Sequence, residues 1–263
     1  MKKYKHQISE EKKRFRKIYR IPIIISILSF VVLIFLIPLP FIVFNKSYYY
    51  NHYEQNRVYD VLGRNNTQAL TFSLLTFFRC DEKAMNQLQK KQKNETCEVF
   101  LKGNYTHNST IFYFTKEEIA HLHDVKHLVR LSIGAIYIAL LVFLLAVVFM
   151  YISIKRKKEK IKNFFNLFTK IVFQGSIFLL LIYIIVVIFV FLINFSSFFN
   201  LFHSFFFPKG NYSFPNNSLL ITLFPESFFY NAAKKIWLSG VITSIIVILA
   251  SFVLNILIKK SKE

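Results

Sequence analysis

Residues 131–154 read LSIGAIYIALLVFLLAVVFMYISI, an apolar stretch that contains no charged residue. About 20 consecutive apolar residues allow an α-helix to cross a bilayer. Three further stretches have the same character, namely residues 21–44, 171–194 and 236–258. Because 54% of the chain is hydrophobic and its mean hydropathy is +0.40, the composition excludes an ordinary soluble protein. We therefore predict an all-α membrane protein with four transmembrane helices.

The distribution of charge predicts how these helices are oriented. Of the net charge of +20, residues 1–20, 155–170 and 259–263 carry +15, whereas residues 45–130 carry +3 and residues 195–235 carry +2. Lys and Arg are enriched on the cytoplasmic side of membrane proteins. We therefore expect a multi-pass protein of the cell membrane, with cytoplasmic N- and C-termini and a cytoplasmic 155–170 loop. The charge is a topological signal, and no nucleic-acid partner is predicted.

The same orientation makes residues 45–130 a small extracellular cap and residues 195–235 an extracellular or interfacial aromatic segment. We expect the cap to have too few apolar residues for a core independent of the membrane. Its two cysteines, Cys80 and Cys97, can form one disulfide that closes a loop of about 18 residues and contributes roughly 3 kcal/mol. Two separate buried thiols are the alternative. The cysteine spacing does not match a metal site, so no metal or cofactor is predicted.

A helix is expected to begin directly after the cap. Thr115 and Glu118 form a Thr-x-x-Glu capping box, which is typical of a helix N-terminus. No residue after it breaks the helix before the second apolar stretch. The sequence therefore predicts one continuous helix from Lys116 to Lys155, whose first turns carry several ionisable residues.

His121 is the first candidate for acid–base chemistry. On a helix it shares a face with Glu117 and Asp124, whereas His123 and His127 point roughly the other way. A carboxylate three or four residues from an imidazole can fix its tautomer and raise its basicity, as a general base requires. The alternative is a solvated helix start with acids in its first turn.

His203 is the second candidate, within residues 195–207, which read FSSFFNLFHSFFF. At helical spacing six of the phenylalanines form one stripe, and His203 lies at its edge beside Phe199. An aromatic belt at the lipid boundary with an incidental histidine is the alternative. His121 lies ten residues before the second apolar stretch and His203 nine after the third. Both rings are therefore expected near one membrane boundary.

These motifs resemble those of a known family. EEIAHLHDVK at 117–126, FHSFF at 202–206 and LLITLFPESFF at 219–229 are similar to motifs of the bacterial lipoprotein intramolecular transacylases, four-span membrane proteins with an extracellular cap. The resemblance implies that an acyl chain moves from the second glycerol position of a diacylglyceryl lipoprotein to the amino group of its terminal cysteine. Membrane lipid and the lipidated N-terminus of a protein would then be the substrate.

The resemblance also implies two catalytic residues. Its His-x-x-Asp-Val pattern falls on His121, and its His-x-x-Phe pattern falls on His203 with Phe206. We assign His121 as the base, supported by Asp124 and Glu117, and His203 as the proton donor.

Phe199 and Phe206 would support His203 as an aromatic wall that excludes water. Two positions depart from the family, which commonly has a tryptophan where this chain has Tyr212 and an acid where it has Ser218.

Two other classes of function remain as alternatives. A non-catalytic four-span protein could bind a partner or a lipid through its cap, with the histidines only packed beneath it. A transporter is disfavoured, because the four apolar stretches contain no Asp, Glu, Lys, Arg or His and transport pathways usually need some. The sequence carries no signal for the oligomeric state.

Overall fold

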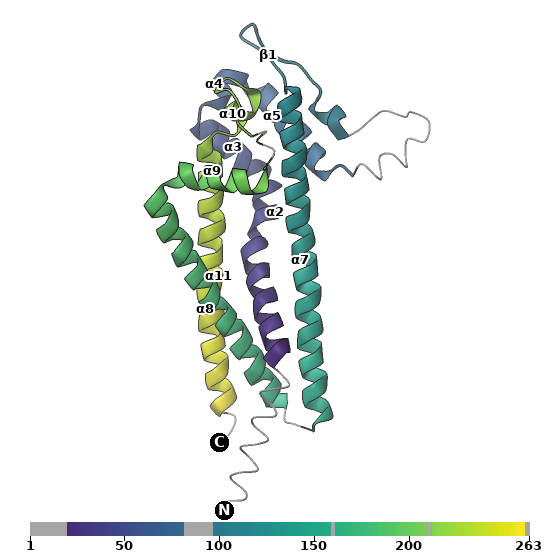
Figure 1. Cartoon of the computed structure of the whole chain (residues 1–263), viewed down its shortest axis with the longest axis vertical. Helices are drawn as coiled ribbons and strands as arrows, with labels where there is room; N and C mark the ends of the chain where they lie inside the picture. Colours follow the sequence, from purple (N-terminus) through teal and green to yellow (C-terminus); the bar gives the residue numbers. More distant parts are fainter. Residues whose placement is uncertain (1–19, 82–96, 159–160, 209, 211, 261–263) are drawn as a thin grey trace, which may run out of the picture. The chain divides into compact units, whose positions relative to one another are not determined.

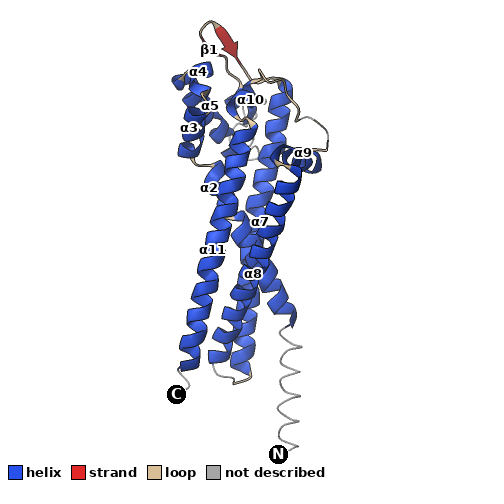
Figure 2. Cartoon of the chain, turned by 90° about the vertical axis from the view of Figure 1, so that its left-hand side faces the viewer, coloured by secondary structure: helices blue, strands red, loops and turns tan. Residues whose placement is uncertain are grey.

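A computed structural model describes residues 20–81, 97–158, 161–208, 210 and 212–260. Over these residues the chain is almost entirely helical, with one short pair of strands (Figure 2). Four of its helical segments are long and apolar enough to cross a membrane, namely Arg20–Val43, Lys116–Arg156, Ile161–Val190 and Glu226–Ile258. The prediction of an all-α membrane protein with four spans is confirmed, apart from the small hairpin.

The chain divides into two compact units. One, which we call the membrane unit, contains the chain up to Pro38, Ser132–Phe189 and the residues from Ile236 onward. The other, the cap unit, combines Leu39–Leu131 with Val190–Lys235. The two segments predicted to leave the membrane on one side, 45–130 and 195–235, therefore fold together.

The helix bounds agree with the apolar stretches at some ends and exceed them at others. Helix α7 (Lys116–Arg156) begins where the capping box predicts and ends one residue beyond the predicted Lys155. Helix α8 (Ile161–Ile193) starts ten residues before the third apolar stretch. The 155–170 segment expected as a loop is therefore helical at Lys155 and Arg156 and again from Ile161 onward.

The first span is interrupted near its end. Helix α2 (Pro38–Val43) follows a one-residue turn at Ile37. Pro38 and Pro40 have no backbone N–H, so each removes one hydrogen bond from the helical ladder. The break is the local consequence of these two prolines.

Close packing and outward apolar side chains characterise the membrane unit. Tyr183 is buried, and a Cβ added to Gly240 would clash with its hydroxyl oxygen, so a larger residue at 240 would require the Tyr183 ring to move. The indole N–H of Trp237 donates to the Tyr183 carbonyl at 3.3 Å. Side chains such as Leu141 and Ile185 are instead largely exposed. Such an exposed apolar surface is typical of a lipid-facing bundle.

Short elements build the cap unit (Figure 1). They are α3 (Lys46–Gln55), α4 (Val58–Leu62), α5 (Arg64–Arg79), the 3-10 turn η1 (Cys97–Leu101), β1 (Tyr105–His107), β2 (Thr110–Phe112), α9 (Phe195–Phe206) and α10 (Leu219–Leu223). The strands are antiparallel, with Thr106 opposite Ile111. The first residues of α7 and of α11 (Glu226–Lys260) complete the unit.

The cap unit has a core of its own, so the expectation that it lacks one is wrong. Its fully buried side chains include Tyr53, Leu70 and Phe77. Leu223 and Phe228, from the segment after α9, belong to the same cluster. The expectation considered residues 45–130 alone, whereas α10 and the start of α11 supply part of the apolar surface that is buried.

Cys80 and Cys97 form a disulfide, as the sequence allowed. The bond joins the residue after α5 to the first residue of η1. It therefore cross-links two elements that pack against each other in the cap unit.

Candidate active site

The first turn of α7 positions His121. The backbone N–H of Thr115 donates to Glu118 Oε2 at 2.7 Å, and the N–H of Glu118 donates to Thr115 Oγ1 at 3.2 Å. This reciprocal pair is the predicted capping box, and it satisfies two donors that the helix itself cannot. His121 follows one turn later and is buried.

A sharp break positions His203. Asn194 separates α8 from α9 with φ +61° and ψ 164°, a strained conformation that residues other than glycine rarely adopt. Its side chain accepts a hydrogen bond from the Ser197 N–H at 2.9 Å, which caps α9. His203 lies in the last turn of α9 and is buried. The aromatic stripe is therefore a separate short helix.

The two histidines meet. Their ring centroids are 6.1 Å apart and the ring planes are inclined by only 22°. Groups that share one reacting centre lie within about 10 Å of each other. The separation of His121 and His203 is compatible with shared chemistry, although the residues are far apart in the sequence and come from different helices.

Aromatic rings from the segment after α9 line this pair. Phe207 contacts both imidazoles, at 4.9 Å from His121 and 5.5 Å from His203. Phe214 lies 5.6 Å from His121, and Tyr212 lies 5.3 Å from His203. The rings hold both imidazoles in an apolar surrounding.

The hydrogen bonding of His203 indicates its tautomer. Its Nδ1 lies 2.8 Å from the carbonyl oxygen of Phe199. Because a carbonyl only accepts, Nδ1 carries the proton and Nε2 keeps a lone pair. Burial lowers the pKa of His203 below its ordinary value, and the bond to Phe199 acts in the opposite direction. Burial thus favours a neutral His203 ring whose Nε2 offers a basic lone pair.

His121 has a different environment. Its Nδ1 is buried and has no hydrogen-bond partner within the described residues. Burial, followed by the neighbouring His203, lowers the pKa of His121 to about 4, and Asp124 opposes this shift. At neutral pH both rings are therefore uncharged, and each can offer one N–H and one lone pair.

The predicted supporting residues differ in their contacts. The Phe199 ring lies 4.1 Å from His203. Phe206 is exposed, and its ring lies 4.7 Å from Phe202 and 4.9 Å from Phe205. Phe207, which follows it, is the ring that contacts both histidines.

Glu117 is exposed on α7 and Asp124 is half-buried. A completely buried carboxylate, that of Glu118, lies three residues before His121 on α7. The sequence identified Glu118 only as a helix cap, and it did not identify Phe207 or Phe214.

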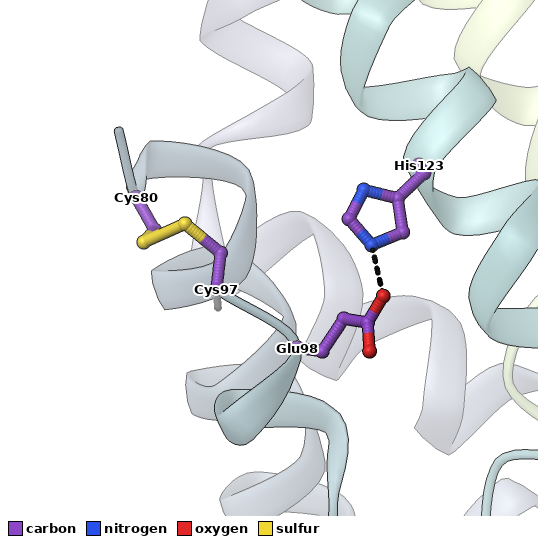
Figure 3. A network of polar contacts seen from close by, with 4 residues as sticks. All are labelled: Cys80, Cys97, Glu98 and His123. Atoms are coloured by element: carbon purple, nitrogen blue, oxygen red, sulfur yellow. Dashed lines mark hydrogen bonds and ion pairs between the residues drawn. A yellow bond between two sulfur atoms is a disulfide. The ribbon is translucent and has the colours of Figure 1, made fainter. Parts of the chain in front are cut away.

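The opposite side of α7 carries a separate polar network. His123 Nε2 lies 3.1 Å from Glu98 Oε1, and Glu98 follows Cys97 of the disulfide (Figure 3). The His123 ring also contacts Phe77 edge-on at 5.0 Å. The prediction that His123 points away from the His121 face is confirmed. Within the parts of the chain that are described, no cluster of three or more His, Cys, Asp or Glu residues could hold a metal ion.

Four spans, a folded cap and two facing neutral imidazoles define an integral membrane protein equipped for acid–base chemistry. The chain belongs to the lipoprotein intramolecular transacylase (Lit) family, whose sequence model matches residues 23–229. It is accordingly an enzyme that acts on lipoproteins in the membrane, as the motifs suggested. The alternative of a non-catalytic membrane protein is not supported by this membership. No curated protein sequence matches the chain.

Solved structures agree on the fold. The structure of the membrane integral lipoprotein intramolecular transacylase Lit from Bacillus cereus shares 19% identity, covers 94% of this chain and 98% of its own, and has a TM-score of 0.59. A point-mutant form of that protein gives 20% identity, coverage of 96% and 99%, and a TM-score of 0.66. At such identities the likeness shows a shared fold.

Proposed function

We propose that His203 and His121 together catalyse the transfer of an acyl chain from the glyceryl group of a lipoprotein to the amine of its terminal cysteine. The observation that carries this proposal is the pair of stacked imidazoles, of which His203 has its tautomer set by the Phe199 carbonyl. Membership of the Lit family supports this reaction. The different environments of the two imidazoles support giving each of them a different role.

The two imidazoles are sufficient to account for every bond and every proton of the reaction. The amine nitrogen attacks the ester carbonyl carbon, while Nε2 of His203 takes the proton that the nitrogen loses. A carbon–nitrogen bond forms, and the carbonyl oxygen carries negative charge in the tetrahedral intermediate. The bond from the acyl carbon to the glycerol oxygen then breaks, and that oxygen receives the proton from His203. The products are an amide and a free glycerol hydroxyl.

His121 is assigned as a neutral hydrogen-bond donor to the developing oxyanion. A ring with a lowered pKa remains uncharged, yet its N–H still stabilises negative charge in an apolar site. This reverses our assignment from the sequence, which made His121 the base because of its carboxylate neighbours. His203 is the better candidate, because a carbonyl bonded to Nδ1 supports basicity at Nε2.

The aromatic wall has a chemical purpose in this proposal. Water competes with the amine for the ester, so excluding water favours transfer over hydrolysis. Phe199, Phe207, Tyr212 and Phe214 surround the imidazoles and would also contact acyl chains. We keep Phe206 in a supporting role, as part of the exposed face of α9 that would meet lipid.

We also propose that the cap unit faces outward, with cytoplasmic N- and C-termini. The excess of +15 on residues 1–20, 155–170 and 259–263 supports this orientation. The membrane would then enclose residues 21–44, 131–154, 171–194 and 236–258, and the reaction would occur at its outer boundary.

The division of roles is testable with glutamine variants. Expressed in a lipoprotein-processing host, the enzyme should yield lipoproteins whose terminal amine is acylated, as mass spectrometry of the N-terminal peptide can measure. Glutamine donates hydrogen bonds but cannot act as a base. His203→Gln should therefore lose about 100-fold or more, whereas His121→Gln should retain roughly a tenth of the wild-type rate.

The opposite ranking would reverse the assignment of base and donor. Full transfer by a variant in which both histidines are alanine would end the proposal.

A further inference from the structure

Glu118 joins two elements that are distant in the sequence. Its side chain is completely buried, and each carboxylate oxygen accepts one short hydrogen bond. Oε2 accepts from the N–H of Thr115 and Oε1 accepts from the N–H of Leu220, both at 2.7 Å. One carboxylate therefore connects the start of α7 to the first turn of α10, two helices that are labelled in Figure 1.

The bond to Leu220 satisfies a donor in the first turn of α10 that the helix itself cannot pair. The first N–H groups of a helix have no partner within it. Ser218 caps α10 by accepting from the N–H of Ile221 at 3.2 Å. Leu220, itself buried, instead finds its acceptor on α7. Without that carboxylate a buried donor would be left unsatisfied, which is costly.

The position of α10 matters because of the segment that precedes it. Residues 207–218 carry Phe207, Tyr212 and Phe214, the rings that contact the two imidazoles. The first end of this segment is attached to α9 by the bond from the Phe207 N–H to the His203 carbonyl at 2.7 Å. Its other end continues into α10, which Glu118 holds through the N–H of Leu220. Glu118 itself lies one helical turn before His121 on α7.

We propose that Glu118 is a positioning residue of the reaction, which holds the aromatic segment 207–218 against the His121–His203 pair through its bond to Leu220. The inference rests on the proposed function of that pair. It assigns Glu118 no contact with substrate. Its role is to keep the wall of the site and His121 in one arrangement.

A purely structural role predicts something different. If Glu118 only capped α7, its loss would be equivalent to the loss of Thr115 Oγ1. Thr115→Ala removes that oxygen but leaves both carboxylate bonds in place, because Glu118 accepts from the backbone N–H of Thr115. Thr115→Ala is therefore the matched control for Glu118 variants.

The experiment compares full-length variants in detergent, with a diacylglyceryl lipopeptide as substrate. Glu118→Gln keeps the size but can accept only one of the two bonds, and kcat should fall about tenfold. Glu118→Ala should lower kcat about 100-fold, since a displacement near 1 Å can have that effect. In both variants KM should change less than threefold. Thr115→Ala should lower the thermal midpoint and leave kcat within threefold.

Hydrogen exchange provides a readout that does not depend on the reaction. Amides of residues 219–224 should exchange faster in both Glu118 variants and remain protected in Thr115→Ala. If exchange increases there but the paired histidine variants remain active, the proposed function fails while the structural link stands. If kcat is unchanged in the Glu118 variants, or falls equally in Thr115→Ala, the positioning role is wrong.

A second variant covers the case in which Glu118 variants do not fold. Ser218→Ala loosens α10 from its other side, because it removes the acceptor for Ile221. It should lower kcat about fivefold, beyond the range allowed for Thr115→Ala, and increase exchange in the same peptide. Full activity of Ser218→Ala with increased exchange would show that α10 does not control the site.

Discussion

His121 and His123 are two residues apart on α7 yet occupy opposite chemical environments. His121 faces another imidazole and aromatic rings, and burial holds its pKa low. His123 is half-exposed and pairs with the Glu98 carboxylate, beside a disulfide. A carboxylate, that of Glu98, is thus bonded to His123, whereas the ring contacts of His121 are aromatic side chains and a second imidazole. The candidate site relies on neutral rings, and the His123–Glu98 pair belongs to the scaffold.

The largest expected effect is on the transfer rate, and it should distinguish the His121 face of α7 from the His123 face. His203→Ala and His121→Ala should each lower the transfer rate by about 100-fold or more, since each removes an acid–base or oxyanion contact. His123→Ala should retain the rate within threefold. The rates come from the acylated fraction of lipoprotein N-termini over time. An equal loss in His123→Ala would show that the two faces are not independent.

Removal of the disulfide beside His123 should lower the stability of the protein and leave its activity intact. Replacing both Cys80 and Cys97 with serine should lower the free energy of unfolding by about 3 kcal/mol, because the bond closes a loop of moderate length. Transfer activity should survive below the new unfolding midpoint. Denaturant titration of the purified protein measures the first quantity. Loss of activity in a still-folded variant would tie the disulfide to the site.

The pH dependence of activity should be determined by the His121–His203 pair and not by His123. Transfer requires a neutral His203, whose pKa lies below its ordinary value. The substrate amine has its own acid limb at about pH 8, and once that limb is measured separately, the remaining decline should begin only below pH 6.5, as the pH falls through the lowered pKa of His203. Single-turnover rates in proteoliposomes between pH 4 and 8 would measure the decline. His123→Ala should not move it, and an acid limb above pH 6.5 in excess of that of the substrate amine would contradict the lowered pKa.

Stability should change over a related range. The pKa of His121 is about 4 when folded and ordinary when unfolded, so the unfolded chain binds more protons between these values. Its contribution is complete above pH 6.5 and is lost as the pH falls toward about 4. His121→Gln should reduce the slope of the unfolding midpoint against pH. An unchanged slope would mean that another group dominates.

The smallest effect belongs to the half-exposed His123–Glu98 pair. Glu98→Gln should reduce the free energy of unfolding by at most about 1 kcal/mol, because both partners are solvent-accessible and salt screens them. The loss should diminish further at high ionic strength. Thermal unfolding at two salt concentrations would measure it. A large effect that does not depend on salt would indicate a more buried role than the structure gives.

Local patterns were sufficient to predict the spans and the start of α7. Apolar runs identify membrane helices because no other backbone arrangement than a helix or closed barrel is satisfied in lipid. The Thr115–Glu118 box is a local motif, and its geometry follows from three residues of spacing. His121 and His203 were identified because the residues that follow each of them match motifs of a known family.

The wall and the roles of the two rings could not be predicted in the same way. Phe207 and Phe214 reach the imidazoles only because the chain reverses after α9, which depends on tertiary packing. The tautomer of His203 depends on the carbonyl of Phe199, a backbone group that residue types do not reveal. Sequence patterns weigh side-chain carboxylates, and this led us to assign the base to His121.

The disulfide also makes the chain between its two cysteines a suitable place to insert a tag. Cys80 and Cys97 hold their Cα atoms 5.9 Å apart, so the chain between them begins and ends at fixed neighbouring positions. The entropic cost of closing a loop grows only with the logarithm of its length. An epitope or a small reporter inserted between the cysteines should therefore disturb folding little. Antibody access to that tag in intact cells would report which side of the membrane the cap unit occupies.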